Sequence, residues 1–462
     1  MVTRPRTASG PQPAPPDGTA PDAGLAAFLA STPRSRAQFH LARRVLPAGV
    51  AKGASFQPPY PLYLDRGEGC YVTTVDGQRL LDVRGHHTAT ILGHGHPAVA
   101  AAVRGQLDRG AALGGPVAAE YGLAAELCRR VPAVERVRFT SSGTEAALHA
   151  LRLVRGRTGR PKVAKFEGAY HGSVDALDVS LRPPAGGAGP ADAPVAVPNV
   201  RGLVRGAVDD VLVLPYNRPA AVAGLLERHR SELAAVFFDP RAGVLPIDLD
   251  FVRFLRRVTA DLGLLLVLDE VVSFRLGPGG LQGLAGVRPD LTLFGKIIGG
   301  GFPLGALGGR ADLLGLLDES DGPSGFAQSG TFSGHPVALA AGLATLQALT
   351  PEAFAHLARL GAAVRRGCDE RFARAGVAAR AVGDGSLFSL HFTDQAVTDA
   401  RTLQTADGAL ARRVSFGLIA GGVLPAPGLT MNALSVPMGD AQVRALLDAL
   451  DDALAGATQT GG

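Results

Sequence analysis

The sequence predicts an α/β protein built around a mostly parallel sheet, and two observations support this fold class. Short apolar runs alternate with helical patterns between about residues 90 and 335, and most runs are continuous in Leu, Val and Phe. Strands that alternate with helices are typical of a parallel sheet, and continuous apolar runs suit strands that are covered on both faces. We interpret five runs as strands: residues 136–140, 162–166, 234–239, 264–269 and 291–295.

Helical patterns lie between these strands, for example at residues 144–156 and 249–262. After Pro336 we expect one long helix rich in Ala and Leu, which leads into a C-terminal region with further runs at residues 386–392 and 441–454. Residues 173–206 contain the low-complexity stretch RPPAGGAGPADAP. A loop of that length inside a compact domain is typical of a functional lid or a disordered insertion.

The first 24 residues are rich in Pro, Ala, Gly and Asp, as in PQPAPPDGTAPDAG. Such a composition buries little apolar area, so we expect a disordered tail and an ordered body that begins near Leu25. No charged region followed by an apolar core stands at the N-terminus, so we expect no signal peptide.

Composition narrows the functional classes. The 462 residues include 46 Lys or Arg and 41 Asp or Glu, a formal net charge of +5, and the Arg residues are scattered. Nucleic-acid binding requires a clustered basic patch, so we expect no nucleic-acid partner. The least charged long stretch, residues 332–350, suits a buried helix better than a membrane span. The sparse cysteines predict a reducing, cytoplasmic location: Cys70, Cys128 and Cys368.

An anion site is predicted where the strand 136–140 leads into a helix. The connecting residues read Ser141-Ser142-Gly143-Thr144-Glu145-Ala146. A Ser or Thr there can cap the helix, and the free N–H groups of the first turn bind anions. Gly143 would let the backbone approach the anion closely. An ordinary capped turn is the alternative interpretation of these residues taken alone.

Two charged residues follow neighbouring strands. Asp269 ends the run LLLVLD, and Lys296 follows LTLFG. Taken singly, Asp269 could cap the next helix and Lys296 could be a surface residue. Open α/β sheets bind ligands where their strands end, so both charges should meet at one edge of the sheet.

A carboxylate and a lysine beside an anion site are what pyridoxal 5′-phosphate requires. The Lys296 amine would form an imine with the aldehyde, and burial would favour its reactive neutral form. The Asp269 carboxylate would hold a proton on the pyridine nitrogen, which makes the ring an electron sink. The helix start at residues 142–144 would bind the phosphate.

Three further motifs bear on the site. Tyr170-His171-Gly172 follows the strand 162–166, where an aromatic ring could stack on a flat cofactor or simply pack in the core. Thr331, in Gly330-Thr331-Phe332-Ser333, precedes a helix and could mark a second anion site. The histidines of GHGHP and nearby could suggest a metal, but no Cys or carboxylate spacing completes a ligand set, so we expect no metal.

In this order and spacing, these motifs resemble the class III (fold type I) pyridoxal-phosphate aminotransferases, especially the branch with glutamate-1-semialdehyde aminomutase and β-amino-acid aminotransferases. The resemblance runs from about Leu46 to Leu454. It rests on PYPLYLDRGEGCYVTTVDGQRLLD, LGHGHP, RFTSSGTEAALHALRLVRGRTGR, KFEGAYHG, LDEVVSFR, PDLTLFGKIIGGGFPLGALGGR and GTFSGHP.

The resemblance implies a role for each matching residue. Lys296 is the implied Schiff-base lysine, Asp269 binds the pyridine nitrogen, and Val271 touches the ring face opposite Tyr170. The cofactor-binding set is completed by Ser142, Gly143, Thr144 and His171 in one subunit, with Thr331 reaching the cofactor of a neighbouring subunit.

The resemblance also implies a domain organisation and a homodimer with shared active sites. After the tail, residues 25–90 would begin a small α+β domain, residues 91–335 would form the large cofactor-binding domain, and residues 336–462 would complete the small domain. Residues 173–206 fall where the aminomutase has its gating loop.

The chain departs from the family pattern at one position near the cofactor and at positions that contact the substrate. An Asn near the cofactor's 3′-oxygen is replaced by Val244, and Ser55 stands where many relatives carry an Arg for the substrate carboxylate. Lys52 is the nearby cation, and His87 falls at an aromatic position of the aminomutase pocket. We therefore treat Lys52, Ser55 and His87 as candidate substrate residues.

The preferred function is an aminotransferase that moves an amino group between an amino compound, such as a β- or ω-amino acid, and a carbonyl acceptor. An aminomutase, which moves the group within one molecule, is the alternative. A cofactor-binding protein without turnover is less favoured, because Lys296 and Asp269 are both kept. A nucleotide-binding dehydrogenase is set aside, because G-x-G-x-x-G does not follow a first strand.

Overall fold

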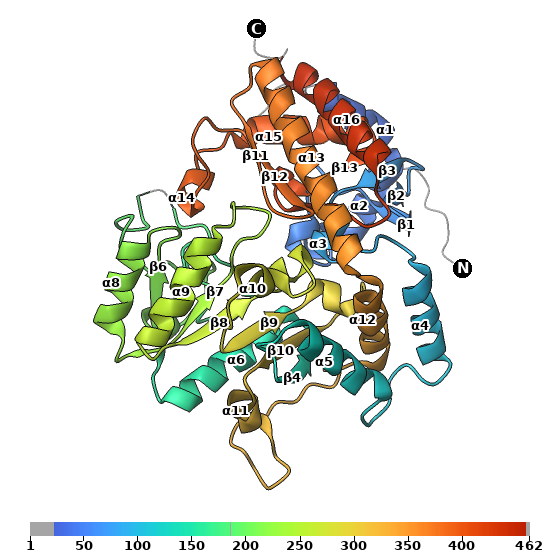
Figure 1. Ribbon diagram of the computed structural model, residues 1–462. Coiled ribbons are helices and arrows are strands. Elements are labelled where there is room, and N and C mark those ends of the chain that lie inside the picture. The colour runs from blue at the N-terminus through green and yellow to red at the C-terminus, as the bar shows by residue number, and fades with distance from the viewer. Residues whose placement is uncertain (1–22, 185, 459–462) are drawn as a thin grey trace.

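The computed structural model describes residues 23–184 and 186–458, and a twisted seven-stranded sheet lies at the centre of this part of the chain (Figure 1). The strand order is β4-β10-β9-β8-β7-β5-β6. Strand β10 is antiparallel to both of its neighbours, and the other strands run in one direction. The strands are β4 (Arg136–Thr140), β5 (Lys162–Phe166), β6 (Val211–Leu214), β7 (Leu233–Phe238), β8 (Leu265–Asp269), β9 (Leu291–Phe294) and β10 (Gly305–Gly309).

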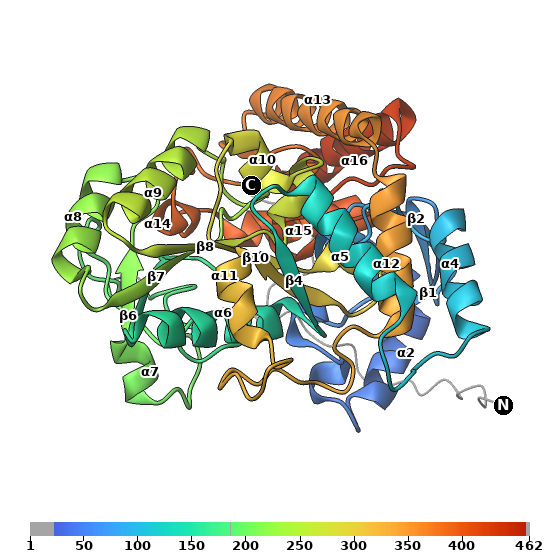
Figure 2. The ribbon, with the colours of Figure 1, turned by 60° about the horizontal axis from the view of Figure 1, so that its bottom comes forward.

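The mostly parallel α/β sheet predicted from the sequence is therefore confirmed, and the five predicted strands correspond to β4, β5, β7, β8 and β9. Strands β6 and β10 were not predicted. Each face of the sheet is covered, which explains the continuous apolar runs. Helix α6 (Gly143–Thr158) packs on one face, and helices α8 (Pro219–His229) and α9 (Leu249–Asp261) pack on the other (Figure 2).

Two smaller sheets join distant parts of the chain. In the first, β1 (Leu64–Glu68), β2 (Tyr71–Thr74) and β3 (Arg79–Asp82) form an antiparallel meander, and β13 (Val423–Leu424) adds to β3 in parallel. The second has the order β11-β12-β14, with bounds Arg380–Val382, Leu387–His391 and Asn432–Ala433. N-terminal and C-terminal segments thus share the upper part of Figure 1. The domain boundaries proposed from the sequence stay a prediction.

The remaining helices surround these sheets. Those before the central sheet are α1 (Ala23–Ser31), α2 (Pro33–Ala42), α3 (Gly85–Thr88), α4 (Pro97–Leu107) and α5 (Ala118–Arg130). Those within and after it are α7 (Arg205–Asp209), α10 (Gly280–Ala285), α11 (Ala311–Leu314), α12 (Pro336–Ala348), α13 (Pro351–Ala375), α14 (Ala400–Leu403), α15 (Gly408–Ala420) and α16 (Asp440–Thr458).

The structure differs from the sequence predictions at two boundaries. The expected long helix after residue 335 is two helices, α12 and α13, because Thr350 caps a new helix and Pro351 occupies its first turn. Helix α1 begins at Ala23, so the last two residues of the predicted tail are helical, and the rest of the tail lies outside the described residues.

Among the described residues, no single helix is long and apolar enough to cross a membrane. Helices α12 and α13 pass the length and composition criteria only as a pair, and they are bent by 77° at the break between them. Most residues of α12 are buried against the rest of the protein, as the sequence predicted for this stretch.

A buried arginine forms hydrogen bonds that connect the central sheet with the N-terminal and C-terminal segments. Arg275 follows β8, and its guanidinium donates to the Thr88 carbonyl oxygen at 2.5 Å and the Leu434 carbonyl oxygen at 2.6 Å. Its Nε donates to Ser386 Oγ at 3.0 Å. Burial lowers the pKa of Arg275 to about 9. One side chain therefore links the central sheet to the N-terminal and C-terminal segments.

Candidate active site

The predicted site residues gather where the parallel strands of the central sheet end. Each of five strands delivers polar residues to the same edge: Ser142 after β4, His171 after β5, Asp239 after β7, Asp269 at the end of β8 and Lys296 after β9. This edge is where open α/β sheets bind ligands.

Asp269 is held by two hydrogen bonds. Its Oδ2 lies 2.9 Å from His171 Nδ1, and its Oδ1 accepts from the Val271 backbone N–H at 3.0 Å. The carboxylate is only slightly exposed. His171 Nε2 is buried and has no hydrogen-bond partner among the described residues. The histidine thus orients the carboxylate.

Lys296 opens a short 3₁₀ turn after β9, in a left-handed backbone conformation with a φ of +50°. Such a conformation costs free energy for a non-glycine residue, and strained backbone is common at functional sites. Burial lowers the pKa of the Lys296 amine, while the charges of Asp269 and Asp239 oppose this shift. The Lys296 side chain and both carboxylates therefore share one region of the sheet edge.

The start of α6 has the features of the predicted anion site. Ser142 caps the helix by accepting the Glu145 N–H at 3.2 Å, and the Glu145 carboxylate accepts the Ser141 N–H at 2.8 Å. These contacts use two of the donors near the helix start. In an α-helix the first N–H groups lack intrahelical acceptors, so those of Gly143 and Thr144 suit an anion.

Close packing brings the helix start, Val271 and the lysine turn together. A Cβ added to Gly143 would lie 3.0 Å from Val271 Cγ2, and one added to Gly295 would lie 3.2 Å from Val271 Cγ1. A Cβ on Gly172 would collide with Thr144. Glycine is therefore required at residue 172, and a side chain at residue 143 or 295 would press on Val271, so these residues pack closely together.

The remaining cofactor-binding predictions are placed differently. Tyr170 follows β5 with its side chain partly exposed, and its backbone N–H donates to Asp239 Oδ2 at 3.2 Å. Thr331 is exposed ahead of α12, and no described contact joins it to Asp269 or Lys296. The predicted role of Thr331 at the cofactor therefore stays a prediction.

His87 lies in an unusual turn. Residues 85–88 all have left-handed φ angles, between +47° and +75°, and three of them are not glycine. Burial, followed by the charges of Lys52, Arg84, His86 and Lys296, lowers the pKa of His87 to about 4. His87 is therefore neutral near pH 7 and lies within the electrostatic reach of Lys296.

The other two substrate candidates lie on the loop before β1. Lys52 is exposed, and its charge contributes to the lowered pKa values of His87 and Lys296. Ser55 is half-buried and donates its backbone N–H to the Lys52 carbonyl oxygen at 3.0 Å. Of these two residues, only Lys52 has a charge, and this charge acts on His87 and Lys296. His94, from the histidine-rich motif, contacts the Asp82 carboxylate at 2.8 Å.

Sequence reasoning missed Arg241. This residue follows β7 with a left-handed φ of +53°, and its backbone N–H donates to Asp239 Oδ1 at 2.8 Å. Its guanidinium lies 3.8 Å from Asp239 Oδ2, and its side chain is 18% exposed. Its charge adds to the lowering of the Lys296 pKa. The available signal was a cation two residues after Asp239, at the end of the predicted strand 234–239.

These residues fit a flat ring that carries a phosphate. The helix start offers N–H groups to the phosphate, and a carboxylate and an amine lie beyond it. The side chain of Val271 packs between Gly143 and Gly295 and can support one face of a ring. His171 holds Asp269 in place through Nδ1, while its buried Nε2 has no hydrogen-bond partner among the described residues.

Comparisons with known proteins agree with this geometry. The family model described as Aminotransferase class-III matches residues 53–454. The β-phenylalanine transaminase of Variovorax paradoxus is 38% identical and covers 93% of this chain and 94% of its own length. A glutamate-1-semialdehyde 2,1-aminomutase of Methanothermobacter thermautotrophicus is 36% identical, covering 92% and 99%. The crystal structure of an omega-transaminase from Sphaerobacter thermophilus has a TM-score of 0.86 at 41% identity, covering 92% and 98%.

Fold and site together define a fold type I enzyme that depends on pyridoxal phosphate. The chain belongs to the class-III aminotransferase family. The resemblance seen in the sequence is therefore confirmed, and so are the cofactor and the enzyme class.

Proposed function

We propose that this aminotransferase takes an amino group from a β- or ω-amino compound and passes it to a carbonyl acceptor. One observation carries the proposal. The residues suited to the cofactor meet at one sheet edge, whereas Ser55 stands where many relatives carry an Arg for the substrate carboxylate. An intact reaction centre with an altered substrate side favours the same chemistry on a different amine.

In this proposal each residue has a defined task. Bound pyridoxal phosphate supplies an aldehyde that condenses with amines and a ring that withdraws electrons. Lys296 Nζ holds the cofactor at rest, then takes a proton from the substrate carbon and returns it nearby, as general base and acid. The Asp269 carboxylate, oriented by His171, keeps a proton on the ring nitrogen.

The remaining residues bind and orient. The N–H groups of Gly143 and Thr144, with the capping Ser142, bind the phosphate. Val271 supports one ring face and Tyr170 covers the other. The cations of Lys52 and Arg241, and the neutral imidazole of His87, face the substrate. Arg241 would bind a donor's carboxylate, since arginine suits planar oxyanions.

An amine-donor screen on purified holoenzyme tests the proposal. We expect β- or ω-amino donors to remove the visible absorbance of the bound cofactor, and an added keto acid to restore it. Lys296→Ala should lose both responses. An enzyme that accepts glutamate-1-semialdehyde alone would refute the substrate assignment.

An aminomutase is the second candidate, because aminomutase relatives match nearly the whole chain. Intramolecular transfer keeps the amino group on one carbon skeleton, so it needs no second substrate. Product formed from glutamate-1-semialdehyde without any added carbonyl acceptor would favour the aminomutase. A strict requirement for the acceptor would favour the aminotransferase.

We also propose a homodimer in which Thr331 completes the partner's site. Large apolar side chains are exposed near this residue and elsewhere, among them Phe332 at 60%, Tyr121 at 73% and Val45 at 81%. Exposed apolar surface of this kind favours association. Light scattering would measure the mass in solution. The cytoplasmic location inferred from the cysteines stays a prediction.

A further inference from the structure

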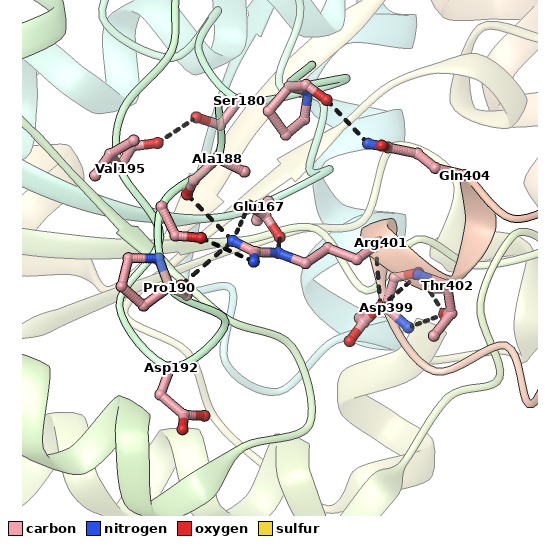
Figure 3. Close-up of polar contacts among 12 residues, drawn as sticks. Glu167, Ser180, Ala188, Pro190, Asp192, Val195, Asp399, Arg401, Thr402 and Gln404 are labelled. Atoms are coloured by element: carbon pink, nitrogen blue, oxygen red, sulfur yellow. Dashed lines mark hydrogen bonds and ion pairs between the residues drawn. The ribbon is translucent and has the colours of Figure 1, made fainter. Parts of the chain in front are cut away.

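Helix α14, from the C-terminal part of the chain, lies beside Glu167 and the long loop that follows β5 (Figure 3). Arg401, the second residue of α14, forms a bidentate ion pair with Glu167, which follows β5. Nε lies 2.8 Å from Glu167 Oε2, and Nη2 lies 3.0 Å from Oε1. The Glu167 side chain is only 5% exposed. Two parallel hydrogen bonds to a buried carboxylate fix the orientation of both groups.

The same guanidinium holds a second segment, which we call the tip: residues 182–194 of the long loop, excluding residue 185. Arg401 donates to three consecutive carbonyl oxygens of the tip, those of Ala188 at 3.1 Å, Gly189 at 2.9 Å and Pro190 at 3.3 Å. Gln404 donates to the Pro183 carbonyl oxygen at 3.0 Å. Figure 3 shows both side chains reaching from α14 toward the loop.

Close backbone packing reinforces this contact. Gly168 has a φ of +82°, and a Cβ added there would lie 2.5 Å from Ala400 Cβ. Any larger residue would force α14 away. The helix itself is fixed by a capping box, in which Asp399 accepts the Thr402 N–H at 2.8 Å and Thr402 Oγ1 accepts the Asp399 N–H at 3.0 Å. α14 is therefore a short rigid element docked on residues 167–168.

From there the contacts continue to the active site. Gly168 donates its N–H to the Ser180 carbonyl oxygen at 2.6 Å, and Lys165 Nζ donates to the Ala169 carbonyl oxygen at 2.9 Å and to that of Val179. The next residues are Tyr170 and His171. The turn that carries the ring-stacking and carboxylate-orienting residues is thus held from outside by α14.

We propose that Arg401 is a positioning residue for the active site. By binding both Glu167 and the tip, it fixes the position of the turn that contains Tyr170 and His171. The inference rests on the proposed roles of those two residues. Arg401 touches neither substrate nor cofactor and acts through Glu167. Loosening it should displace Tyr170 and free the tip at the same time.

The test compares Arg401→Gln with Arg218→Ala in full-length holoenzyme. Arg218 is the matched control, because it also pairs with the tip, through Asp192 at 2.7 Å, but both side chains are exposed. Such exposed pairs contribute little. We expect Arg401→Gln to release cofactor faster and to lower kcat/KM by about 10- to 100-fold, as misplacement near 1 Å can do. Arg401→Lys should recover part of the loss.

Elastase cleavage provides a readout independent of turnover. The tip contains Ala188 and Ala191, and elastase can cut after each of them once they are accessible. Mass spectrometry should find cleavage within residues 182–194 in Arg401→Gln, and not in the wild type or Arg218→Ala. If Arg401→Gln does not fold, Arg401→Lys should show the same changes to a smaller extent, and Gln404→Ala should increase cleavage of the tip.

The proposal would be overturned if the folded Arg401 variants released cofactor at the wild-type rate and their tip was cleaved no more than that of the wild type. Failure of the proposed function is a separate result. A wild-type enzyme inactive with every donor would refute the aminotransferase assignment, while cofactor release and elastase cleavage would still decide the role of Arg401.

Discussion

At the scale of single residues, the Asp269–His171 pair explains how the carboxylate is held in one orientation, as it must be to keep a ring nitrogen protonated. His171 Nδ1 and the Val271 N–H occupy one oxygen each of the carboxylate, which cannot rotate without losing both contacts. A carboxylate fixed in advance pays no reorganisation cost when the ring nitrogen must remain protonated.

The Asp269→Asn variant should therefore still bind the cofactor but should lose most of the enzyme's activity. The amide has nearly the same shape and carries no charge, so we expect kcat to fall by roughly 100- to 1,000-fold. Steady-state kinetics with the best donor would measure this. Asp250→Asn, at a carboxylate with 89% exposure, is the control and should match the wild type. A fully active Asp269→Asn would remove Asp269 from the mechanism.

Arg241 provides a second prediction at this scale. Its guanidinium is held close to the site by a strained backbone and makes only a 3.8 Å contact with Asp239. Arg241→Met should raise KM for carboxylate-bearing donors by about 10-fold or more, the equivalent of one charged hydrogen bond of ~1.5 kcal/mol. Amines without a carboxylate should be affected little. An equal change for both substrate types would exclude a carboxylate contact.

At the scale of elements, the strands that deliver the site could be predicted because they are apolar and covered on both faces. Asp269 and Lys296 stood out as charges at the ends of such strands. Strand β10 could not be predicted, because Gly305, Gly308 and Gly309 have low strand propensity. The structure explains them: a Cβ on Gly308 would lie 2.8 Å from Val134, and one on Gly305 would meet the Ser142 carbonyl.

The contacts of Glu167 and Arg401 could not be predicted for a different reason. The two residues are 234 positions apart and both lie outside long regular elements. No periodic pattern relates residues of two irregular segments. Only the packing of the C-terminal segment against the loops of the central sheet brings them together. The site was thus predictable where strands deliver it, and not where loops do.

Strand β5 carries a buried titratable group with a measurable effect. Burial lowers the pKa of Lys165 to about 7, from an ordinary value of 10.5. Between these values the unfolded chain binds more protons at this position than the folded protein. The free energy of unfolding should therefore rise with pH over this window, by at most ~1.4 kcal/mol per pH unit, and Lys165 should contribute no slope below it.

Urea unfolding at several pH values between 6 and 10 would test this expectation. The useful quantity is the difference between the wild type and Lys165→Met, because other groups titrate in both proteins. The wild type should gain stability relative to the variant as the pH rises through 7 and beyond. Parallel curves would mean that Lys165 stays protonated in the folded state.

At the scale of the whole molecule, the proposed shared site predicts complementation. Lys296→Ala removes the amine and Thr331→Asp places a negative charge beside the partner's phosphate, so each variant alone should be inactive. In a mixed dimer one site combines Lys296 of one subunit with Thr331 of the other. Random exchange should restore about a quarter of wild-type activity. No recovery after verified exchange would contradict the shared site.

The pairing of β13 with β3 has a consequence for biosynthesis. The first three strands of the N-terminal sheet leave the ribosome early, yet their fourth strand and the Leu434 carbonyl bound by Arg275 are made more than 300 residues later. Until then the edge of β3 lacks its neighbour, and unpaired edges invite wrong partners. The nascent N-terminal segment must therefore wait, shielded or unstructured, until translation is almost complete.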